Sequence, residues 1–155
     1  MSMTTQQDGV LFMSKVYLAC YHGRAKKFSH RIYDGITKFF TKGRYSHCEI
    51  AISLSDGRFE CYTSSYRDGG VRCKAMDLPS DKWELVQLSI THEQVKAYFK
   101  HTQGEGYDLW GALGVVTLFK QSDKKFFCSE WCYNCIFNSN KGYRFSPSDL
   151  YDLIK

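Results

Sequence analysis

Apolar residues with strand-like spacing fill the middle of the chain. The segment 47–54, HCEIAISL, is rich in β-branched residues and ends at a Ser-Asp-Gly turn signal, and 58–65, RFECYTSS, follows as its hairpin partner. A glycine turn with a third short strand is predicted in 67–76, and a fourth strand in 82–90. The earlier segment 16–23, VYLACYHG, is typical of a strand or of a short buried segment. We therefore expect an antiparallel sheet here.

Apolar residues at helical spacing flank these strands. Residues 29–43 predict a helix that stops at a glycine, and Thr91 with Gln94 forms a capping-box signal ahead of another helical pattern. Residues 104–120 are typical of a loop that leads into a further helix. Because the helices and the strands are segregated along the chain rather than alternating, the order predicts an α+β architecture.

A final helix is predicted over 127–142, FCSEWCYNCIFNSNKG, closed by Asn140 and Gly142. Its cysteines follow the spacing i, i+4 and i+7, which on a helix forms one continuous stripe. These residues are Cys128, Cys132 and Cys135.

Composition places the chain among globular proteins and adds little about partners. The 155 residues are 43% hydrophobic with only two prolines, which predicts a single domain over residues 1–155. No apolar run reaches the ~20 residues of a membrane span, and the N-terminus lacks the pattern of a signal peptide, so we expect a cytoplasmic protein. Seven cysteines without a secretory signal favour free thiols over a disulfide framework.

The net charge of +5 arises mostly from a basic stretch in residues 24–44. Such a stretch suits nucleic acid or an anionic surface, but a solvated helix face is the commoner explanation. No recognisable nucleic-acid module accompanies the charge, so we predict no specific nucleic-acid partner. Contact with a membrane surface remains open.

The cysteine spacing admits a metal, a catalytic thiol or simple packing. A zinc site needs four ligands with a paired second half, which the sequence lacks, and an iron–sulfur barrel enzyme needs a long chain after its cysteines. We therefore predict no metal and no cofactor. Cys132 and Cys135 are expected to pack as small hydrophobic residues. Cys128 differs because it begins the predicted helix, where the dipole and unpaired amides stabilise a thiolate.

A nucleophilic thiol requires an imidazole and a third polar group that orients the imidazole. Of five histidines, His47 is the best placed, because it opens a central strand that can face a helix N-terminus. Glu60 on the hairpin partner is the first choice for the third group. The register of that strand is not fixed by sequence, so three further residues stay open. They are Tyr62 and Ser64, which share the parity of Glu60, and the less favoured Glu49, which shares the parity of His47.

Four fragments in order carry a family resemblance: YSHCEIAIS, SDGRF with RDGGVR, GYDLWGALG and FFCSEWCYNCI, spanning about residues 44–137. Together they resemble the circularly permuted NlpC/P60 group of papain-like cysteine peptidases and amidases, which includes YiiX-like hydrolases and is related to the lecithin–retinol acyltransferase type. The resemblance implies a permuted papain-like fold, a small antiparallel sheet packed against helices. It also implies Cys128 as nucleophile, His47 as base and a third polar residue near Glu60.

These residues lead us to expect a cysteine hydrolase that acts on a peptide, amide or acyl-ester substrate. Two alternatives stay open. One is an acyltransferase or thioesterase acting on lipids, favoured by the basic stretch and an apolar segment at 110–119. The other is a catalytically silent binding module on the same fold.

Overall fold

The structure is a computed structural model that describes residues 4–5, 11–23, 43–107 and 125–155. Its strands are β1 (Thr4–Thr5), β2 (Leu11–Phe12), β3 (Val16–Tyr21), β4 (His47–Ser53), β5 (Phe59–Ser65), β6 (Gly70–Met76), β7 (Trp83–Gln87), β8 (Gly106–Tyr107) and β9 (Lys125–Phe126). Its helices are α2 (His92–Thr102), α4 (Cys128–Phe137), the 3₁₀ turn η1 (Gly142–Arg144) and α5 (Pro147–Ile154). The predicted α+β class is confirmed.

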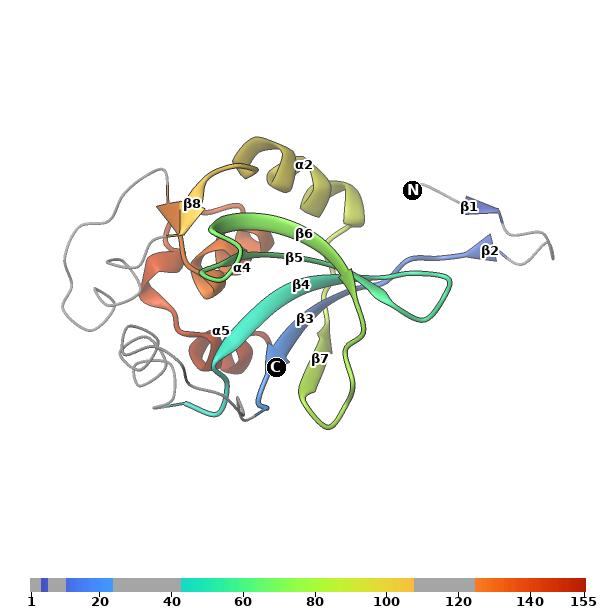
Figure 1. Cartoon of the computed structure of the whole chain (residues 1–155), viewed down its shortest axis with the longest axis horizontal. Helices are drawn as coiled ribbons and strands as arrows, with labels where there is room; N and C mark the ends of the chain where they lie inside the picture. Colours follow the sequence, from blue (N-terminus) through green and yellow to red (C-terminus); the bar gives the residue numbers. More distant parts are fainter. Residues whose placement is uncertain (1–3, 6–10, 24–42, 108–124) are drawn as a thin grey trace.

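A seven-stranded sheet organises most of the described residues, with strand order β7-β3-β4-β5-β6-β8-β9, and β1 pairs separately with β2. The five longer strands are antiparallel neighbours, and Figure 1 shows them as a curved sheet with α4 and α5 on one side. The predicted hairpin is present as β4 and β5, whose turn places Gly57 at φ 85°, a conformation that favours glycine. The sequence did not predict that β3 lies between β4 and β7.

The main core lies between the sheet and the helices. Leu18, Ile50, Trp131 and Leu150 are fully buried there. A smaller apolar cluster occupies the other face of the sheet, where Ala51 and its neighbours pack against partly buried aromatic side chains. Both faces of the central strands are therefore covered, as strands with near-continuous apolar runs require.

The last two strands lead the chain to the start of α4. Beyond β6, the sheet continues through the two-residue strands β8 and β9. The Ser64 hydroxyl donates a hydrogen bond of 2.5 Å to the carbonyl oxygen of Phe126, the last residue of β9. Cys128 then begins α4 two residues later. The position of this helix start is thus tied to the sheet through β5.

The helix ends correct the sequence prediction in two places. Thr91 caps α2 by accepting from the Gln94 amide at 3.2 Å, as predicted, but the Gln94 side chain donates to the carbonyl of Cys135 on α4 at 3.1 Å. Helix α4 ends at Asn138, a left-handed cap with φ 48°, rather than at the later asparagine and glycine.

Three predicted features fall outside the described residues. The helix predicted over 29–43 is described only at its last residue, and the basic stretch 24–44 only at its last two. Of the segment 104–120, only residues 104–107 are described. Within the described ranges, no helix combines the length and apolar character needed to cross a membrane.

Candidate active site

The Cys128 thiol lies at the first position of α4, against the sheet. The residue before it is extended, so the helix begins at the cysteine itself, which is only 2% exposed. The first amides of a helix have no partner within it and carry its positive dipole end, an arrangement that favours a thiolate at this position. Cys132 and Cys135 continue the same helix face into the core, as expected for packing residues.

His47 is the first residue of β4, and it belongs to the opposite face of the sheet from α4. Side chains alternate along a strand, so His47 and Glu49 share one face while Cys48 and Ile50 face the helix. The described pairing of β4 with β5 starts only at Ile50, and nearer the strand start the Thr63 hydroxyl donates to the Cys48 carbonyl at 2.9 Å. The first residues of β4 therefore lie beyond the described pairing with β5, although they remain paired with β3.

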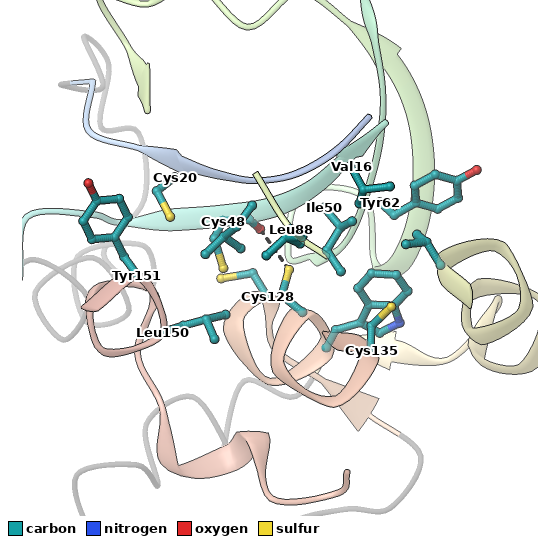
Figure 2. Close-up of a cluster of buried hydrophobic side chains, with 14 of the residues drawn as sticks. Val16, Cys20, Cys48, Ile50, Tyr62, Leu88, Cys128, Cys135, Leu150 and Tyr151 are labelled. Carbon is teal, nitrogen blue, oxygen red and sulfur yellow. Dashed lines mark hydrogen bonds between the residues drawn. The ribbon is translucent and has the colours of Figure 1, made fainter. Parts of the chain in front are cut away.

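The Cys128 sulfur occupies this place at the start of β4. It accepts a hydrogen bond from the backbone amide of Cys48, interacts with the Cys48 thiol, and forms a side-chain hydrogen bond with His47. Figure 2 shows Cys48 and Cys128 facing each other between the strand and the helix. The structure thus brings together the two residues that the sequence singled out as nucleophile and base, although they start from opposite faces of the sheet.

The two groups stabilise each other's charged forms. The Cys48 hydrogen bond, the charge of His47 and its hydrogen bond together hold the pKa of Cys128 well below its usual value, against the opposing effect of burial. Burial also lowers the pKa of His47, but the Cys128 thiolate and Glu49 outweigh it and raise the pKa to about 10. The lowered pKa of Cys128 and the raised pKa of His47 both favour a thiolate beside an imidazolium.

Glu49 is the carboxylate that contacts the imidazole. Its Oε1 lies 2.9 Å from Nε2 of His47, which leaves Nδ1 of the ring for Cys128. Arg72 on β6 binds the same carboxylate with both guanidinium nitrogens, Nη2 to Oε1 at 2.6 Å and Nη1 to Oε2 at 2.9 Å. Glu49 is 1% exposed, and its bonds to His47 and Arg72 overcome burial and lower its pKa to about 2.

Glu60, the favoured third residue of the sequence analysis, lies elsewhere. It pairs with Ile52, the far end of β4 from His47, and it contacts the Tyr62 hydroxyl and Lys96. Tyr62 therefore faces Glu60 rather than the imidazole. The other alternative on β5, Ser64, binds the β9 backbone. Glu49 takes the place expected for Glu60, and Arg72 is a further residue that sequence reasoning did not find.

A tryptophan ring lies beside the imidazole. The His47 side chain is 27% exposed, and its ring lies 6.2 Å from that of Trp83 in an edge-to-face arrangement. Trp83 also lines an open hollow of about 590 Å³, together with His22 and Arg44. No cluster of three or more potential metal ligands occurs in the part of the chain that the structure describes.

Comparison with known proteins identifies no relative of the chain. No family model matches the chain, and no curated protein or solved structure matches it.

Proposed function

We propose that this protein is a cysteine hydrolase that cleaves an amide, peptide or ester bond with Cys128 as nucleophile and His47 as acid and base. The observation that carries the proposal is the ion pair between a thiol at a helix start and an imidazole whose other nitrogen is bound to a buried carboxylate. This is the arrangement that thiol catalysis requires. Glu49, rather than Glu60, is the third residue we assign.

The resemblance to the circularly permuted NlpC/P60 group supports the same chemistry. In that group the histidine comes first, on a strand, and the cysteine comes last, at a helix start. Here His47 opens β4 and Cys128 opens α4, and α4 packs against β4 and β5. We propose a permuted papain-like fold on this basis.

The charges suggest the course of the reaction. The Cys128 thiolate attacks the carbonyl carbon, and amides at the start of α4 are suitably placed to stabilise the oxyanion. His47 gives its Nδ1 proton to the leaving group, which departs and leaves a thioester. Water then attacks the thioester while neutral His47 accepts a proton, and the acid product leaves. Glu49 holds Nε2–H throughout, so Nδ1 stays directed at the reacting atoms.

Substrate access is expected on the side of the imidazole. Cys128 is nearly covered, whereas His47 is partly exposed and faces Trp83. The hollow beside Trp83 offers apolar surface with His22 and Arg44 at its border. An acyl group next to an apolar or aromatic side chain suits such surroundings.

Alkylation by iodoacetamide at neutral pH, followed by peptide mapping, tests the proposal without a known substrate. Exposure alone would make Cys73 the first cysteine to be alkylated, because it is the exposed cysteine among the described residues. Its pKa, however, is raised by partial burial of the sulfur and by the charge of Glu60. We expect modification at Cys128 first. Substitution His47→Ala should slow it by about 100-fold, and Cys73→Ala, the matched control, should leave it unchanged. Preferential modification of Cys73 would contradict a privileged thiol at Cys128.

Turnover of p-nitrophenyl acetate then separates an enzyme from a silent binding module. We expect a burst of nitrophenolate followed by slower steady turnover, with both lost in Cys128→Ala. Added amine or alcohol acceptors distinguish hydrolysis from acyl transfer, because a transferase forms the acylated acceptor in preference to acetate. A reactive thiol with no turnover would favour the binding module.

A further inference from the structure

The Glu49 carboxylate is shared between two cations, and only one of them takes part in proton transfer. We propose that Arg72 is a positioning residue that keeps Glu49 ionised while His47 is neutral, and so preserves the orientation of the imidazole during hydrolysis of the thioester. The proposal rests on the function proposed above.

The argument begins with the charges in the two halves of the reaction. Before acylation, the Cys128 thiolate, the His47 imidazolium, the Glu49 carboxylate and the Arg72 guanidinium carry two negative and two positive charges. After acylation the sulfur is a neutral thioester and His47 has given its proton to the leaving group. Glu49 then remains paired with Arg72, which also binds Asp68, and Asp68 lies near Lys74 in turn.

Without Arg72, the same step would leave a lone buried carboxylate. Glu49 is 1% exposed, and an isolated buried carboxylate takes up a proton rather than stay charged. A protonated Glu49 accepts the His47 Nε2–H less well, and the neutral ring could turn or change tautomer. Nδ1 would then no longer be available as the base for water.

The geometry of Arg72 suits this role. Two of its nitrogens bind the two carboxylate oxygens at 2.6 and 2.9 Å, and its Nε binds Oδ2 of Asp68 at 2.9 Å. The side chain is only 16% exposed, so the pair is little screened by solvent. A planar fork held at three points fixes the carboxylate in one orientation, which a lysine cannot do.

The other groups around Glu49 cannot replace Arg72. The thiol of Cys61 on β5 faces the carboxylate, and burial together with the charge of Glu49 raises the pKa of that thiol. Lys74 on β6 is 3.8 Å from Asp68 and largely exposed, so it serves Asp68 rather than Glu49. Apart from His47, Arg72 is the cation bonded to Glu49 among the described residues.

The test compares the two phases of p-nitrophenyl acetate turnover across pH in the full chain. In Arg72→Met we expect a burst rate within about threefold of wild type but a steady rate lower by about 10- to 100-fold at neutral pH. The ascending acid limb of the steady rate should move up by about one pH unit. This shift follows because loss of the guanidinium raises the pKa of His47 in the acyl-enzyme, or that of Glu49 itself.

Two further variants separate charge from structure. Arg72→Lys should restore the position of the acid limb, because it restores the positive charge. It should restore only part of the steady rate. Arg58→Met is the matched control, since Arg58 pairs with the exposed Asp56 in the β4–β5 turn, and it should change neither phase. A lower rate in Arg72→Met with an unmoved acid limb, or a limb that lysine fails to restore, would overturn the positioning role.

A measurement on the wild type covers the case in which Arg72→Met does not fold. Cys128 alkylated with iodoacetamide imitates the neutral thioester, and the side-chain carbon signal of Glu49 is then followed by NMR as His47 titrates. We expect Glu49 to stay ionised when His47 loses its proton; proton uptake by Glu49 at that point would refute the proposal. Absence of any Cys128-dependent burst in the wild type would instead refute the proposed hydrolase, so the two failures differ.

Discussion

The substitution Glu49→Gln removes the buried charge on which the site depends, at almost unchanged side-chain volume. It takes from His47 and Arg72 their shared carboxylate, and among the described residues Arg72 keeps Asp68 as its ionised partner. The difference between the ordinary carboxyl pKa of 4.5 and the value of about 2 in the fold corresponds to about 3 kcal/mol. Removal of one partner from a buried ion pair costs a similar 3–5 kcal/mol. We therefore expect unfolding free energy to fall by about 3 kcal/mol at neutral pH.

The pH dependence of this loss has a definite sign. Because the folded-state pKa of Glu49 is depressed, its stabilisation is complete above pH 4.5 and is lost as the pH falls toward 2. The gap in stability between wild type and Glu49→Gln should thus shrink over this range. Reactivity should change as well, because loss of the carboxylate lowers the pKa of His47 from about 10 and moves the alkaline limb of turnover down by about one pH unit.

Urea denaturation at several pH values, with turnover measured in parallel, checks both effects. Glu60→Gln is the matched control, since Glu60 is a partly exposed carboxylate on the neighbouring strand and should cost only about 0–1 kcal/mol. Equal losses in the two variants at neutral pH, with the alkaline limb unmoved, would refute the assignment of Glu49 to the site.

Three other substitutions test further contacts. Cys48→Ala removes the largest contribution to the low pKa of Cys128, so the pH at which iodoacetamide reacts with Cys128 should rise by about one unit; an unchanged profile would count against that hydrogen bond. Gly142→Ala places a Cβ 2.5 Å from a carbonyl oxygen of α4 and should cost about 1–3 kcal/mol in denaturation, whereas an unchanged midpoint would contradict the close contact. Thr102→Val leaves the buried Trp131 Nε1–H, now bonded at 2.9 Å, without its acceptor and should cost about 1–3 kcal/mol, with Thr102→Ser close to wild type.

Local signals in the sequence predicted local structure well. The Asp-Gly turn placed the β4–β5 hairpin, and Thr91 placed the start of α2, because both depend on a few adjacent residues. The position of β3 between β4 and β7 was not predictable, since these pairings join distant segments and their register depends on the whole core. The short helix α5 also escaped prediction, although Ser146 and Pro147 are typical helix-start residues.

In the candidate site, too, local features were predictable and long-range contacts were not. Cys128 and His47 were identified because the start of a helix and the start of a strand each have a recognisable sequence pattern. The third residue was sought first on the neighbouring strand, with Glu49 as the less favoured alternative. The carboxylate that contacts His47 is Glu49, two residues along β4 itself, whereas Glu60 pairs with the far end of that strand. Arg72 reaches Glu49 across β5, a contact that depends on the register of three strands.

The central claim is that Cys128 is a thiolate paired with imidazolium at neutral pH, and direct titration of that thiolate tests it. The ultraviolet absorbance of thiolate, measured against pH for wild type minus Cys128→Ala, isolates this sulfur from the other six cysteines. The account predicts a signal already present at neutral pH, with an apparent pKa well below the ordinary 9.0, that shifts upward in His47→Ala. A thiolate that appears only near pH 9.0, in both proteins alike, would contradict it.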